Sequence, residues 1–174
     1  MPRSLRLRDM ELQLPALLAA NETYRQEEFT TVPRTPEPSR HLVILTCMDA
    51  RLDMFRALGL EVGEVHILRN AGGRASGDAI RSLVVSAHLL GTREVGVVHH
   101  TNCGLEGRTE AEVAAKTGVD DMEFLVFADI EQSVMADVEA IRASGKLPSG
   151  FVVWGGVYDV DTGGLRIVAE PQHD

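Results

Sequence analysis

Short apolar runs recur along the chain, separated by polar segments that contain glycine. Runs of this length that are rich in valine, isoleucine and leucine are typical of buried strands. We therefore expect strands at 41–46, 64–69 and 94–100. Two further runs, 150–160 and 165–170, flank the turn signal "DTGG" and predict a closing pair of strands.

Between these runs, apolar residues return at the spacing of a helix rather than a strand. The four expected helices lie at 15–29, 53–59, 77–91 and 129–145. Pro15 suits the first turn of the first helix, and Gly59 and Gly91 suit the ends of the second and third. The last helix has an apolar face made of Ile130, Val134, Val138 and Ile141.

The order strand, helix, strand, helix, strand predicts an α/β fold of three layers. In such a fold a mainly parallel central β-sheet is flanked by helices. We interpret the whole chain, 1–174, as one domain, in which 41–170 form the α/β core. Residues 1–40 form an N-terminal helix and a proline-rich arm, because "TVPRTPEPSR" (31–40) holds three prolines and predicts an extended segment.

Composition and charge narrow the possible partners. The 26 acidic and 17 basic residues give a formal charge of −9, which argues against binding to nucleic acid. No apolar run approaches the roughly 20 residues that cross a bilayer, so we expect no membrane partner. The segment "LPALLAA" is too short for a signal peptide, and we expect a cytoplasmic protein. In that reducing compartment a disulfide between the two cysteines is disfavoured.

Side chains that bind metals follow two of the expected strands. Cys47 follows the first strand, and His100 and Cys103 stand as His-x-x-Cys at the end of the third. Ligand sites in parallel sheets lie beyond the carboxyl ends of the strands, so these side chains converge if the two strands are neighbours. Two thiolates and one imidazole suit Zn²⁺ and leave a fourth position open, as in catalytic sites. The alternative is two core thiols and a surface histidine.

Two charged residues follow Cys47 within the stretch "CMDAR". Asp49 is able to reach either the open metal position or Arg51, and a two-pronged contact with Arg51 would fix the carboxylate. Held in this way, Asp49 orients a metal-bound hydroxide; released, it becomes a fourth ligand and closes the site. The alternative is an ion pair of little consequence at the start of a helix. His99 precedes His100 and should point to the opposite face of its strand.

The motifs "CMDAR", "RNAGG" and "HHTNCG", with the late "VYDVDTG", resemble the small bacterial subgroup of the β-class carbonic anhydrases. The resemblance covers residues 41 to 170. It implies an α/β fold, an obligate dimer or higher homo-oligomer with an exchanged N-terminal arm, and zinc held by Cys47, His100 and Cys103. It also implies that Asp49 and Arg51 are the catalytic pair. Asn102 differs from the aspartate of many relatives.

The expected function is the reversible hydration of carbon dioxide to bicarbonate and a proton, through a zinc-bound hydroxide. One alternative is a zinc hydrolase of carbonyl sulfide or carbon disulfide on the same scaffold. Another is a non-catalytic dimer that binds zinc or bicarbonate. Gly72 and Gly73 do not match the dinucleotide-binding spacing. We expect them to let the backbone approach the metal site and to contribute to substrate binding.

Overall fold

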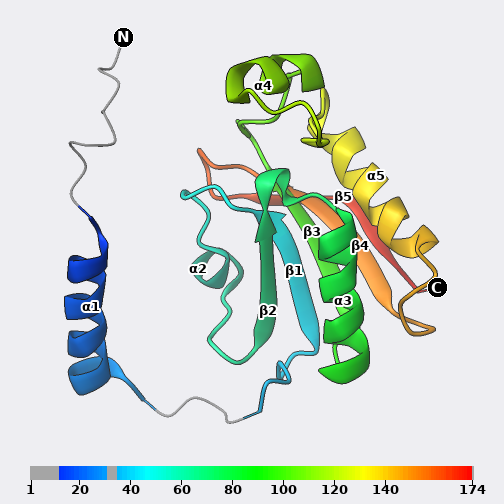
Figure 1. The fold of residues 1–174 in the computed structure, drawn as a ribbon. Helices are drawn as coiled ribbons and strands as arrows, with labels where there is room; N and C mark the ends of the chain where they lie inside the picture. Colours follow the sequence, from blue (N-terminus) through cyan, green and yellow to red (C-terminus); the bar gives the residue numbers. More distant parts are fainter. Residues whose placement is uncertain (1–11, 31–34, 174) are drawn as a thin grey trace. The chain divides into compact units, whose positions relative to one another are not determined.

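The computed structural model describes residues 12–30 and 35–173 of the chain (Figure 1). The chain divides into two compact units, residues 1–34 and 35–174. In the first unit, helix α1 (Leu14–Thr23) has Pro15 in its first turn, as the sequence predicts, and continues into a π-helical turn, η2 (Tyr24–Glu28). The two elements together cover the helix predicted at 15–29 to within a residue. Part of the proline-rich arm, 31–34, lies outside the described residues.

The second unit is built on a five-stranded sheet with the order β2-β1-β3-β4-β5. The strands are β1 (Leu42–Cys47), β2 (Val65–Asn70), β3 (Glu94–His100), β4 (Val152–Tyr158) and β5 (Leu165–His173). The first four run parallel, and β5 pairs antiparallel with β4 across the predicted turn. The expected fold class is therefore confirmed. The strand ends lie within two residues of prediction, except that β5 continues to His173 and not to 170.

Side-chain caps explain where the helices begin. The helices are α2 (Met54–Leu58), α3 (Gly77–Leu89), α4 (Glu110–Thr117) and α5 (Ile130–Ala143), with a short 3-10 turn, η3 (Ala71–Gly73). Asp53, Ser76 and Asp129 each accept a hydrogen bond from the backbone of α2, α3 or α5. Helix α4 was not predicted from the sequence, although Thr109 and Glu112 form a capping box at its start.

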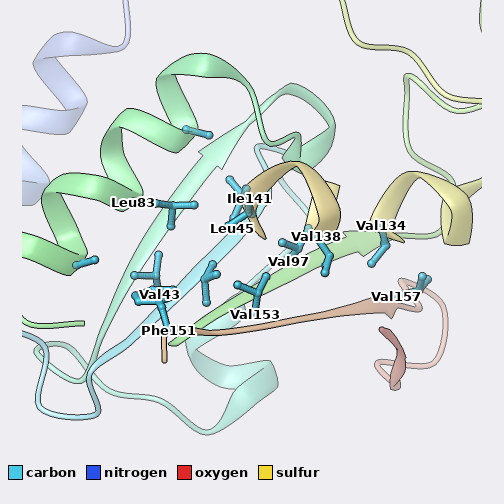
Figure 2. Close-up of a cluster of buried hydrophobic side chains, with 13 residues drawn as sticks. Val43, Leu45, Leu83, Val97, Val134, Val138, Ile141, Phe151, Val153 and Val157 are labelled. Carbon is cyan, nitrogen blue, oxygen red and sulfur yellow. The ribbon is translucent and has the colours of Figure 1, made fainter. Parts of the chain in front are cut away.

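The largest cluster of buried apolar side chains lies between the sheet and helices α3 and α5 (Figure 2). Val134, Val138 and Ile141 come from α5 and are at most 1% exposed, as the predicted apolar face requires. A second cluster, on the other face of the sheet, includes Met54 of α2 and both cysteines. No helix of the described residues combines the length and apolar character needed to cross a membrane.

Candidate metal centre

The three predicted metal ligands lie together at the carboxyl end of the sheet. Cys47 ends β1 and His100 ends β3, and these strands are parallel neighbours. The turn after β3 carries Cys103, and the ligand atoms of the three residues lie within 4.8 Å of one another. All three residues are buried. The alternative of a surface histidine does not fit, because His100 is 0% exposed.

The ring of His100 is oriented to offer a nitrogen to this cluster. Its Nδ1 lies 2.9 Å from the carbonyl oxygen of Thr101, so Nδ1 carries the proton and Nε2 keeps a lone pair. Nε2 is buried and has no hydrogen-bond partner among the described residues. A metal ion would satisfy this lone pair. His99 faces the other way, with its Nε2 3.1 Å from Asp137, as the strand alternation predicts.

The environment of the two thiols favours a thiolate. A hydrogen bond from Cys103 is the largest effect that lowers the pKa of Cys47, to about 4. Burial opposes this shift, whereas His100 and the backbone amides of Asp49 and Gly72 add to it. The same contact, followed by burial, raises the pKa of Cys103. Cys47 is therefore a thiolate at neutral pH, the form in which cysteine binds a metal ion.

Asp49 lies beside the cluster and is held there by Arg51. Arg51 donates two hydrogen bonds to the carboxylate oxygens, at 2.9 and 2.8 Å, and a third to the carbonyl oxygen of Asn102 at 3.0 Å. The bonds from the Arg51 side chain, with a further one from its backbone amide, hold the pKa of the Asp49 carboxyl far below its usual range. Its Oδ2 lies 3.8 Å from Nε2 of His100. Arg51 therefore connects the loop after β1, which carries Asp49, to the loop after β3, which carries Asn102. The alternative of an ion pair of little consequence at a helix start does not account for this connection.

Arg69, the fifth residue of β2, is a site residue that was not predicted from the sequence. Its guanidinium donates to three main-chain carbonyl oxygens, those of Cys47 (2.9 Å), Asp49 (2.6 Å) and Leu52 (3.2 Å). Arg69 therefore fixes the backbone of the loop that carries the first thiolate and the carboxylate. Its position within "RNAGG" was the available signal, but the convergence of three carbonyls on one side chain appears only in the folded chain.

Glycines after β2 bring the backbone against the cluster. Gly73 has a φ of +71°, and a Cβ at this position would lie 2.9 Å from the carbonyl carbon of Thr46 and 3.0 Å from the backbone nitrogen of Cys47. Gly72 has a φ of +78°, and its amide donates to the Cys47 sulfur. Both conformations favour glycine. The close approach expected of this segment is therefore present.

A buried ion pair supports the glycine segment from the side of α5. Arg74 donates to both carboxylate oxygens of Asp137, at 2.7 and 3.2 Å, and to the carbonyl oxygen of Leu125. Its guanidinium also lies 5.6 Å from the centre of the Phe127 ring. Burial raises the pKa of Asp137, but His99 and Arg74 outweigh it and leave the pKa below its usual value. Arg74 and Asp137 are 63 positions apart, and their pairing was not predicted from the sequence.

A pocket of about 430 Å³ opens beside the cluster. Cys47, Asp49 and Cys103 line it, together with apolar residues that include Ala71 and Leu105. A small molecule in this pocket can therefore reach two cysteine sulfurs, an ionised carboxylate and apolar walls at once. This combination suits a metal-assisted reaction of a small and largely apolar substrate.

Comparisons with known proteins agree with this arrangement. A family model described as Carbonic anhydrase matches residues 42–125. The chain is 38% identical over 141 residues to Beta-carbonic anhydrase 1 of Mycobacterium tuberculosis, which covers 78% of this chain and 86% of that protein. It is 32% identical over 157 residues to a carbon disulfide hydrolase of an Acidianus strain, covering 74% of this chain and 77% of that protein.

Among solved structures, the carbonic anhydrase from Streptococcus mutans is similar over most of its length. The TM-score is 0.84 at 41% sequence identity, and the match covers 91% of this chain and 99% of that chain. The mainly parallel sheet with flanking helices is therefore an architecture that the two chains share.

Proposed function

The chain belongs to the β-carbonic anhydrase family, and on that basis we propose that it is a zinc-dependent carbonate dehydratase. It hydrates carbon dioxide reversibly to bicarbonate and a proton. The observation that carries the proposal is the cluster of Cys47, His100 and Cys103, whose ligand atoms lie within 4.8 Å of one another beside the paired Asp49 and Arg51.

Cys47, His100 and Cys103 are the proposed zinc ligands. Two sulfurs and one imidazole nitrogen match the ligand chemistry of Zn²⁺, and three protein ligands leave a fourth position free. The unpartnered, buried Nε2 of His100 supports this assignment. When bound, zinc supplies a water molecule whose pKa falls from about 15.7 toward roughly 7.

The proposed role of Asp49 is to orient the attacking water. Because its pKa is depressed by Arg51, the carboxylate is ionised at neutral pH and can only accept hydrogen bonds. An acceptor beside the ligand cluster holds the water with a lone pair directed at the carbon of carbon dioxide. If Arg51 released the carboxylate, Asp49 would be free to turn toward the cluster and close the site as a fourth ligand.

Gly72, Gly73 and the apolar wall are proposed to receive the substrate. Carbon dioxide carries no net charge, so it gains from apolar contacts with Ala71 and Leu105 and needs no basic patch. The overall charge of −9 is compatible with such a substrate. The proton released by hydration must pass to buffer, through the open side of the pocket.

The proposed assembly is a homodimer or higher homo-oligomer in the cytoplasm. In α1, Leu14, Leu17 and Leu18 are each more than 60% exposed. Apolar side chains gathered on a short helix usually become buried against a partner. Sedimentation of the full chain at micromolar concentration should therefore show no stable 19.0 kDa species.

A second candidate is hydrolysis of carbonyl sulfide or carbon disulfide at the same site. The sequence identity of 32% to a carbon disulfide hydrolase is the observation that supports this second candidate. A non-catalytic zinc- or bicarbonate-binding dimer is the third.

One experiment separates the three candidates. The zinc-loaded chain is mixed with carbon dioxide in a stopped-flow instrument, and proton release is followed with a pH indicator. Release of hydrogen sulfide from carbonyl sulfide and carbon disulfide is measured in parallel. Fast proton release that is lost in Cys103→Ala supports the carbonate dehydratase. Hydrogen sulfide release alone supports the hydrolase, and zinc binding without either product supports the binding dimer.

A further inference from the structure

Two residues that the proposed mechanism does not use as reactive groups flank the ligand cluster. The amide of Gly72 donates a hydrogen bond to the sulfur of Cys47, and the amide of Leu105 donates one to the sulfur of Cys103. The two residues belong to different segments, the 3-10 turn after β2 and the loop after β3. A backbone hydrogen bond therefore holds Gly72 beside the Cys47 sulfur and Leu105 beside the Cys103 sulfur.

The side chain of Leu105 crosses from one of these segments toward the other. Its Cδ1 lies 3.2 Å from the position that a Cβ on Gly72 would occupy. A contact of this length would be tighter than most contacts of a real Cβ, so the two residues approach each other closely at the cluster. Leu105 is half-buried and packs with the apolar cluster that contains both cysteines.

The pocket as a whole is too large to select among molecules of three atoms. Its volume is about 430 Å³, and it is lined by residues of three segments. Selection by size must therefore happen where the walls come closest to the reacting position. Leu105 lines the pocket, its amide is bonded to the Cys103 sulfur, and its Cδ1 approaches Gly72 on the opposite wall.

We propose that Leu105 is a specificity-determining residue, which limits the size of the linear molecule that reaches the metal position and so favours carbon dioxide over its sulfur analogues. The inference rests on the proposed function. Sulfur is larger than oxygen, so replacing one oxygen of carbon dioxide by sulfur lengthens and thickens one end of the molecule. The methyl groups of Leu105 would clash with the sulfur end of the molecule, and a smaller side chain would leave room for it.

The test compares carbon dioxide with carbonyl sulfide, which differs from it by one atom. Hydrolysis of carbonyl sulfide consumes one water and yields carbon dioxide and hydrogen sulfide, with no oxidant or reductant. We expect Leu105→Ala to raise the ratio of kcat/KM for carbonyl sulfide to kcat/KM for carbon dioxide by about tenfold or more, the effect of about one methylene in an apolar pocket. Leu105→Met, which conserves volume, should leave the ratio near the wild-type value.

Leu58 provides a matched control, because it is also half-buried and packs with the same apolar cluster but does not line the pocket. Leu58→Ala should lower stability without changing the substrate ratio. An unchanged ratio in Leu105→Ala, or an equal change in Leu58→Ala, would overturn the inference.

A second readout does not depend on turnover. Cyanate and thiocyanate are linear anions that differ by the same oxygen-to-sulfur exchange, and calorimetry measures their binding to the zinc-loaded protein. The affinity ratio of thiocyanate to cyanate should rise in Leu105→Ala and stay constant in Leu58→Ala. If the wild type binds both anions but hydrates no carbon dioxide, the proposed function is wrong. The size limit is then tested by the affinity ratio alone: a rise in Leu105→Ala supports it, and an unchanged ratio contradicts it.

Discussion

Replacing Gly73 by alanine should damage the metal centre through the backbone alone. The added Cβ would lie 2.9 Å from the carbonyl carbon of Thr46 and 3.0 Å from the backbone nitrogen of Cys47. Neither neighbour is a flexible side chain, so the turn η3 must move away from the end of β1. The expected result is a less stable protein that binds zinc less tightly, because the residue being displaced carries a ligand.

The size of the effect has two parts. A left-handed conformation at φ +71° costs an alanine about 1–2 kcal/mol. Forcing a methyl group into packed backbone adds about 1–3 kcal/mol. The sum is about 2–5 kcal/mol, and each kcal/mol lowers the melting temperature of a chain of this length by about 2–4 °C.

Gly59 separates these two parts. It also has a left-handed conformation, at φ +62°, but nothing lies within 4 Å of the Cβ that alanine would add. Gly59→Ala should therefore show only the conformational cost and should keep wild-type zinc affinity. Calorimetric melting of both variants, with and without zinc, and zinc titration against a competing chelator measure the difference. If Gly73→Ala matched Gly59→Ala in melting temperature and zinc affinity, the close approach would have no role in the site.

Three further replacements test the site and its support. Cys103→Ala should lose its zinc on dialysis, because two protein ligands hold the ion poorly, and full occupancy by metal analysis would contradict the ligand set. Arg51→Lys keeps the charge but loses the planar two-pronged contact with Asp49. It should retain zinc and lower kcat about a hundredfold, as a displacement of about 1 Å can do, and wild-type turnover across the pH range would refute this role. Asp137 has a folded-state pKa below its unfolded value near 3.9, so its contribution to stability is full above that pH and is lost as the pH falls toward the folded value. Asp137→Asn should therefore show a weaker dependence of the unfolding free energy on pH below about 5, and an unchanged slope in acid denaturation would contradict it.

The parts of the molecule that sequence predicted well depend on local pattern and one topological rule. The strand 94–100 was placed at its exact bounds because a short valine-rich run, with Glu94 before it and two histidines after it, marks it clearly. The convergence of Cys47 with His100 followed from placing two parallel strands side by side, which the sheet order confirms. Helix α4 was missed because it buries no residue, so it has no apolar face to reveal it.

The supporting contacts of the site could not be read in this way. Arg69 donates to three main-chain carbonyl oxygens, and every residue has the same carbonyl group, so no side-chain pattern marks the acceptors. Arg74 and Asp137 are one of many possible pairs of opposite charge in this chain, and only the packing of α5 on the sheet brings them together.

Two arginines hold different parts of Asp49, one its main chain and the other its side chain. Arg69 holds its main-chain carbonyl oxygen at 2.6 Å, and Arg51 holds its carboxylate at 2.8 and 2.9 Å. Because Arg69 also holds the carbonyl oxygen of Cys47, the backbone position of this thiolate does not depend on Arg51. Replacing Arg51 should therefore free the carboxylate to rotate while the ligand stays in place. This is the physical reason to expect Arg51→Lys to keep its zinc and lose its turnover.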